Sequence, residues 1–217
     1  MNWNKDAAPG RQRDSVPAAV AVQADFKVTG MRDLEIKMTM ANHGSESAYV
    51  FDRLWTLEAA SRPVADPEPS YRFIRDGRLQ LVLGPCPLPR LRSATFRNIP
   101  HVTVLAAGSE LKRTLALSGP IKEYSFYFPE PSDSGYDQVH VTTVQVVVQY
   151  VVARYPLTIE PSRVIPSAME VVTPGALDDL RTVIVTSPKV ELDVLRRNDE
   201  FDRLTLPGEQ PEPLHLR

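Results

Sequence analysis

Strict alternation of apolar and polar residues is the feature that most constrains how this chain can fold. From Val20 to Val28 every second residue is apolar, and the same pattern returns from Leu34 to Met40. A period of two places the apolar side chains on one face of an extended strand, and that face is then half-buried against a core. Both segments are therefore predicted to be β-strands, with Gly30 ending the first one.

Several more segments carry the β-branched and aromatic residues typical of strands. Together they predict about nine to eleven short strands, at the spacing expected of an all-β sandwich. The run at 139–152 is continuously apolar at its centre, which places it in the middle of a sheet. The other predicted strands lie at 48–56, in a hairpin at 71–83, at 101–106, 111–117 and 121–128, and in a final strand pair at 181–186 and 189–195.

One short helix is expected near the C-terminus. Thr173 is a favoured N-cap residue, and Pro174 suits the first helical position before the sequence GALDDLR. Strands do not alternate with long helical segments, so a doubly wound nucleotide-binding fold is not expected. The predicted fold class is an all-β, antiparallel β-sandwich with one short helix near the C-terminus.

The 217 residues fit one large domain or two small ones. Residues 1–18 show no periodicity and are predicted to form a flexible arm. We expect a single β-sandwich domain at 19–205, made of a core (19–160) and a C-terminal extension (161–205). Residues 206–217 are predicted to be a Pro-rich tail.

The N-terminal segment lacks the apolar stretch of a signal peptide. We therefore expect a cytoplasmic protein if Met1 is the native start, and otherwise a periplasmic or secreted protein whose leader has been removed. No apolar run reaches the roughly 18 residues that a membrane-spanning helix needs.

Few residues of this chain suggest catalysis or metal binding. Cys86 is the single cysteine, which excludes a disulfide within the chain and a zinc site built on thiolates. The four histidines lack ligand spacing, and the phosphate-binding, zinc-protease and nucleophile-elbow motifs do not occur. The acidic loop with Glu130, Asp133 and Asp137 does not have the spacing of a calcium loop. We expect no cofactor, no metal and no catalytic residues.

Basic charge is concentrated in one part of the chain. Residues 71–113 carry 8 basic and 2 acidic side chains, although the whole chain has a net charge of -2. This stretch contains a hairpin turned by Asp76-Gly77 and a stiff loop with three prolines at 84–92. Arginines interleaved with aromatic residues make 71–97 the predicted contact face. The predicted binding residues are Arg72, Arg75, Arg78, Arg90, Arg92 and Arg97.

Two interpretations of this arginine-rich stretch stay open. Its aromatic side chains can point into the core while the arginines are merely solvated, or both can contact a partner. The isoelectric point of 6.1 argues against nucleic acid, so the predicted function is a non-catalytic protein-binding or structural module with a protein partner. The pattern selects no oligomeric state. A hydrolase in which His101 or His140 meets carboxylates is the alternative function.

Two segments resemble a known family of domains. LEIKMTMANHG followed by AYVF, and VTVLAAGSELKRTLAL further on, are similar to strand–turn–strand patterns of bacterial immunoglobulin-like domains of the intracellular proteinase inhibitor type. The resemblance implies an immunoglobulin-like β-sandwich with Trp55 as its buried strand tryptophan, and it adds proteinase inhibition as a further alternative function. The Trp-rich Gly hairpin of that family is absent, and the Pro-rich segment 61–70 stands in its place, so no reactive-site residue is carried over.

Overall fold

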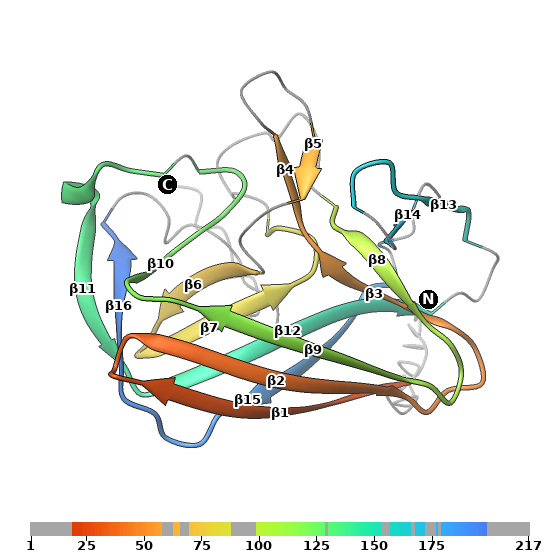
Figure 1. Cartoon of the computed structure of the whole chain (residues 1–217), viewed down its shortest axis with the longest axis horizontal. Coiled ribbons are helices and arrows are strands. Elements are labelled where there is room, and N and C mark those ends of the chain that lie inside the picture. The colour runs from red at the N-terminus through yellow and green to blue at the C-terminus, as the bar shows by residue number, and fades with distance from the viewer. Residues whose placement is uncertain are drawn as a thin grey trace, which may run out of the picture.

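The computed structural model of this chain describes residues 19–57, 63–65, 70–87, 99–128, 130–152, 157–165, 168–171, 177 and 179–198. These residues form strands joined by turns, with a single 3-10 turn (η1, Asp133–Gly135) among them, so the all-β prediction is confirmed (Figure 1). The predicted arm (1–18) and the predicted Pro-rich tail (206–217) lie outside the described residues.

A three-stranded antiparallel sheet forms one layer, in the order β1-β2-β9. Its strands are β1 (Val20–Thr29), β2 (Asp33–Asn42) and β9 (Glu110–Leu117). β1 and β2 pair without interruption along their whole length, as their strict alternation predicts. The apolar side chains of β2 are all buried, and they are Leu34, Ile36, Met38 and Met40.

The opposing layer is an eight-stranded sheet whose main path runs β13-β14-β8-β3-β12-β7-β6, with β15 paired to β12. Its strands are β3 (Ala48–Arg53), β6 (Tyr71–Arg75), β7 (Arg78–Leu83), β8 (His101–Leu105), β12 (Thr143–Val152), β13 (Ile159–Pro161), β14 (Met169–Val171) and β15 (Arg181–Thr186). The main core joins buried side chains of β2 and β9 to those of β3, β7 and β12, so it lies between the two layers (Figure 1).

β12 is the centre of the larger sheet, as its apolar sequence predicts. On one side it pairs with β15, and on the other it pairs first with β7 and then with β3. Gly84 lies at a fork, the point where the neighbour of β12 changes from β7 to β3. A Cβ at Gly84 would stand 2.8 Å from the Cβ of Gln149 in β12. Only glycine therefore lets the chain leave β12 at this point without displacing Gln149.

Two smaller sheets complete the described fold. One has the order β10-β16-β11 and contains β10 (Ile121–Lys122), β16 (Leu192–Arg197) and β11 (Tyr136–Val141). The other pairs β4 (Trp55–Leu57) with β5 (Pro63–Ala65). β5 begins with proline, which suits a strand that is not central in a sheet.

Two strand predictions near the acidic loop are wrong in extent. The strand predicted at 121–128 is the two-residue β10, because the next amide groups bond to different neighbours: Glu123 to the carbonyl of Leu195 and Tyr124 to the carbonyl of Arg72. The predicted strand 139–152 is divided at Thr142 into β11 and β12.

The predicted final strand pair does not form, since β15 pairs with β12 and β16 pairs with β10 and β11. β15 and β16, which lie in the predicted extension (161–205), thus each pair with strands from the range 19–160. The sheets are also mixed instead of purely antiparallel, because β7–β12 and β10–β16 are parallel pairs. A parallel pair needs a long crossover, and the chain from β8 to β11 provides one between β7 and β12.

The predicted C-terminal helix is not seen. Thr173 and Pro174 lie outside the described residues, and Leu177 and Asp179 lie in turns. The amide N–H of Leu180 donates to the carbonyl of Leu177, three residues earlier, whereas an α-helix bonds four residues apart. A helix of two turns is marginal without strong packing. None of the described residues forms a helix long and apolar enough to cross a membrane.

Candidate functional site

The predicted Asp-Gly hairpin is present, and its tip carries two arginines. Asp76 and Gly77 have φ angles of 49° and 69°, as a type I′ turn requires. The turn sets Arg75 directly opposite Arg78 in the β6–β7 pair, so both side chains leave the same face. The amide N–H of Thr142 donates to the carbonyl of Gly77 at 3.0 Å, which ties the tip to the start of β12.

Three charged side chains stand next to one another at this tip: those of Arg75, Asp76 and Arg78. The Oδ2 of Asp76 lies 3.8 Å from Nη2 of Arg78, whose side chain is 50% exposed, and such surface pairs contribute little in water. The tip therefore holds two guanidinium groups and one carboxylate on a fixed backbone, and planar guanidinium groups suit the recognition of carboxylates.

The structure separates Arg72 from these two arginines. Arg72 is only 5% exposed. Its Nε donates to the carbonyl of Lys122 at 2.7 Å, and its Cζ lies 5.1 Å from the centre of the Tyr124 ring. Arg72 therefore stabilises the contact of β6 with the segment after β10. The remaining predicted binding residues, Arg90, Arg92 and Arg97, lie outside the described residues.

A buried carboxylate near Arg72 was not singled out by the sequence. Oε1 of Glu123 accepts the amide N–H of Ile74 at 2.5 Å, and its Oε2 accepts the amide N–H of Arg197 at 2.7 Å. Arg197 is itself buried and donates through Nη1 to the carbonyl of Phe128 at 3.3 Å. Glu123 thus fastens β6 to β16. Its signal in the sequence is weak, because a glutamate in a polar–aromatic stretch is usually solvated.

A second candidate site joins Ser162, His101 and Glu170. Nδ1 of His101 lies 3.0 Å from Oγ of Ser162, and its Nε2 lies 3.5 Å from Oε1 of Glu170. The amide groups of Val164 and Ile165 donate to the same Oγ at 3.0 and 2.9 Å. Both lone pairs of Oγ are then occupied, so its hydroxyl proton is directed at Nδ1 of His101.

Burial keeps the imidazole of this site neutral, because it lowers the pKa of His101 against the opposing effect of Glu170. The ring proton then sits on Nε2 and faces the carboxylate. A serine, an imidazole and a carboxylate in series are the components of an acyl-transfer site. The two backbone donors, however, engage the oxygen lone pairs that a nucleophile must use.

Trp55 covers this histidine. Its ring stacks on His101 with the ring centres 6.4 Å apart, and its Nε1 donates to the carbonyl of Ile99 at 2.8 Å. The edge of Phe126 contacts the indole on another side, with 5.9 Å between ring centres. The indole thus lies outside the main core, which differs from the core position that the resemblance implies.

His140 meets carboxylates on both ring nitrogens. Its Nδ1 lies 3.0 Å from Oδ1 of Asp193, its cross-strand partner, and its Nε2 lies 2.5 Å from Oε2 of Glu191. The hydrogen bonds to Asp193 and Glu191 raise the pKa of His140. Because the two carboxylates lie against opposite ring nitrogens, they cannot coordinate one metal ion together with the imidazole. Across the described residues no group of three His, Cys, Asp or Glu could hold a metal.

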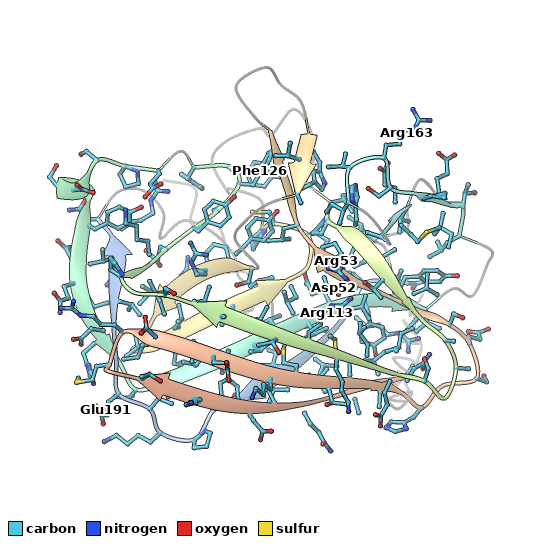
Figure 2. The ribbon with its side chains drawn as sticks, in the orientation of Figure 1. Asp52, Arg53, Arg113, Phe126, Arg163 and Glu191 are labelled. Atoms are coloured by element: carbon cyan, nitrogen blue, oxygen red, sulfur yellow. The ribbon has the colours of Figure 1, made fainter. Side chains whose placement is uncertain are left out.

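A third charged cluster joins the two layers. Figure 2 shows Asp52, Arg53 and Arg113 gathered where β9 passes β3. Nε of Arg113 donates to Oδ2 of Asp52 at 2.6 Å, and its Nη2 donates to Oγ1 of Thr103 at 3.0 Å. Arg113 comes from the β1-β2-β9 sheet and the other residues from the eight-stranded sheet. The cluster therefore connects the two layers at the β9 side of the fold.

Cys86 is an inert, buried thiol. Its Sγ lies 3.2 Å from Oγ of Ser125, and burial raises the pKa of the thiol to about 11. A reactive cysteine needs a thiolate near neutral pH, so Cys86 has a packing role.

Comparison of the chain with protein-family models, with curated proteins and with solved structures found no match.

Proposed function

We propose that the protein is a non-catalytic binding module that presents the Arg75–Arg78 hairpin tip to an acidic segment of a protein partner. The observation that supports this most is the placement of Arg75 directly opposite Arg78 at the tip of a hairpin, because two guanidinium groups on one face suit the recognition of carboxylates. A carboxylate of a partner would accept paired hydrogen bonds from a guanidinium group. The loops of a rigid scaffold are also where recognition is commonly placed. The proposed contact face remains 71–97, with Arg90, Arg92 and Arg97 as further contributors.

The finer fold class that we propose is an immunoglobulin-like β-sandwich. Support for it comes from the β1-β2-β9 sheet, which faces the larger sheet across one core. A scaffold of this kind keeps its loops in place while they contact a partner, so the cost of ordering them on binding is small.

The hairpin proposal is tested by capture from a cell lysate with immobilised protein. The test variant is Arg75→Glu combined with Arg78→Glu, and the matched control is Arg163→Glu. Arg163 is exposed, and Figure 2 places it beside β13 and β14, away from the β6–β7 hairpin. We expect a partner that is held by wild type and control but lost with the double variant, while the melting temperature stays close to that of wild type. Equal capture by the double variant would overturn the proposed face.

A hydrolase is the second candidate function, and the series Ser162–His101–Glu170 favours it. A fluorophosphonate probe that reacts with activated serines distinguishes the two functions. Labelling of wild type that disappears in Ser162→Ala and His101→Gln would support a hydrolase. An unlabelled Ser162, in protein shown to be folded, would remove this alternative.

Proteinase inhibition is the alternative that follows from the family resemblance. It is measured as the residual activity of serine and cysteine proteinases mixed with excess protein. Full residual activity with each proteinase would leave the binding module as the proposal.

A further inference from the structure

The β1 edge of the β1-β2-β9 sheet has no proline and no bulge, two of the devices with which proteins protect exposed strand edges. β1 has 10 residues, contains no proline and pairs with β2 without a bulge. Of the strands that the structure describes, only β2 pairs with β1. Figure 1 shows β1 at the boundary of the molecule, near β15 of the opposing layer. A long, regular edge of this kind is a template on which another strand can pair.

The inner face of β1 is incompletely covered. Val22, Ala24, Phe26 and Val28 pack against the main core and yet are only half-buried. The corresponding residues of the neighbouring strand β2 are buried. The side of the fold between β1 and β15 therefore leaves apolar surface that a further strand would remove from water.

The other edge of the same sheet is different. On β9, Arg113 reaches across to Asp52 and Thr103 of the opposing layer, so side chains close that side. β9 also carries Lys112 next to Arg113, and two adjacent cations would repel the same pair on a second copy. Of the two edges, β1 is the one that the described residues leave open to pairing.

The charges of β1 are complementary to themselves in one antiparallel register. Asp25 and Lys27 are both exposed and lie on the outer face, on either side of Phe26. A two-fold axis through Phe26 sets Asp25 opposite Lys27 of a second copy and sets Lys27 opposite its Asp25. We infer that β1 pairs in this register with β1 of a second copy. The result is a symmetric dimer in which the β1-β2-β9 sheets of the two copies become one continuous sheet.

Neighbouring registers are disfavoured by the same residues. Moving the axis from Phe26 to Asp25 sets Asp25 against Asp25, and moving it to Lys27 sets Lys27 against Lys27. Like charges at opposite positions are destabilising. Any register with the axis between two residues would set inner-face side chains against outer-face ones, which the pleat forbids. The Phe26-centred register also places the two Phe26 rings next to each other on the inner face.

The dimer is tested first by sedimentation velocity over a range of protein concentrations. We expect a monomer–dimer equilibrium, and hydrogen exchange at high concentration should slow the amides of 23–29 relative to a dilute sample. A protein that stays monomeric up to its solubility limit would overturn the inference. A dimer whose formation leaves the exchange of these amides unchanged would also overturn it.

Charge inversion then tests the register. The inverted variant is Asp25→Lys, Lys27→Asp, Glu35→Lys and Lys37→Glu. The β2 changes are needed because Asp25 pairs with Lys37 and Lys27 with Glu35 inside one copy. Inverted copies are complementary to each other, and so are wild-type copies, but a mixed dimer has two repulsive pairs. The first control is wild type mixed with isotope-labelled wild type, which gives the statistical fraction of mixed dimer in native mass spectrometry.

We expect the inverted variant to dimerise like wild type and the mixed dimer to fall to about a tenth of its statistical fraction. The partial variant Asp25→Lys with Lys37→Glu, which stays paired with β2 but opposes Lys27 of the second copy, should raise the dissociation constant about tenfold. Statistical mixing of wild type with the inverted variant would show that the dimer does not form through this register, and would overturn the inference. Thermal unfolding of each variant shows that the monomer is folded.

Discussion

Removing Arg113 should destabilise the fold more than removing Asp52, although the two form one ion pair. Nε of Arg113 and Oδ2 of Asp52 are 2.6 Å apart, and the two side chains are 22% and 1% exposed. Arg113→Met leaves a carboxylate that water cannot reach, and breaking a buried pair in this way costs about 3–5 kcal/mol. Arg53 lies 3.8 Å from the same oxygen and offsets part of the loss, so we expect about 2–4 kcal/mol.

The reverse change leaves a cation that water can reach. In Asp52→Leu the guanidinium group of Arg113 keeps its bond to Oγ1 of Thr103 and is partly solvated, so the expected cost is about 1–2 kcal/mol. The double variant leaves no unpaired carboxylate. It should therefore be more stable than Arg113→Met alone, which is the behaviour of a buried pair replaced by apolar residues.

The assay is equilibrium unfolding in urea, followed by tryptophan fluorescence, with free energies compared at matched m-values. Arg163→Met is the control for loss of an exposed arginine, and it should change the free energy of unfolding by no more than about 0.5 kcal/mol. The reasoning would be refuted if Asp52→Leu were as damaging as Arg113→Met. It would also be refuted if the double variant cost the sum of the two single changes.

Three further outcomes are expected. Gly84→Ala should lower the free energy of unfolding by about 1–3 kcal/mol, because the new Cβ meets the side chain of Gln149. Gln149→Ala should restore only part of the loss, because its own Cβ would still stand 2.8 Å from the new one, and an unchanged urea midpoint for Gly84→Ala would contradict the fork described above. Cys86, whose pKa burial raises to about 11, should react with a thiol reagent at pH 8 only after denaturant is added, so rapid labelling of folded protein would be inconsistent with its packing. The two carboxylate-bound histidines should titrate on opposite sides of the ordinary value of 6.5, with the pKa of His101 lowered and that of His140 raised. The contribution of His140 to the free energy of unfolding is then complete below pH 6.5 and is lost as the pH rises through its folded pKa. The contribution of His101 has the opposite sign of pH dependence: it is complete above pH 6.5 and is lost as the pH falls through its folded pKa. NMR titration of the two rings, with His101→Gln and His140→Gln to assign them among the four histidines, checks both signs; two pKa values on the same side would contradict the contacts.

The local patterns of the sequence predicted most of the strands. Alternation at Leu34–Met40 fixed both the strand and its buried face, since a period of two has one meaning for a half-buried strand. Asp76-Gly77 identified its turn because few residues tolerate two successive positive φ angles. The continuous valines near Val147 predicted a central strand.

What the sequence could not predict depends on partners that are distant along the chain. Alternation does not specify the direction of a neighbour, so the parallel β7–β12 pair was missed. Arg72 was predicted to be a binding residue on an exposed face, because it alternates with the aromatic residues Tyr71 and Phe73. A second segment covers it at Tyr124, however, and both faces of β6 are therefore buried. The contact of His101 with Ser162 joins segments 61 positions apart, and no spacing rule connects them.

The central position of β12 also determines when the protein can complete its core during synthesis. Its neighbours are β3 and β7, which are made before it, and β15 (Arg181–Thr186), which is made after it. Pairings between segments so far apart form slowly, because a long loop must close first. While the ribosome is still adding the residues before β15, one edge of this valine-rich strand has no neighbour. A nascent chain halted at that stage exposes an unpaired edge, and unpaired edges are prone to aggregation.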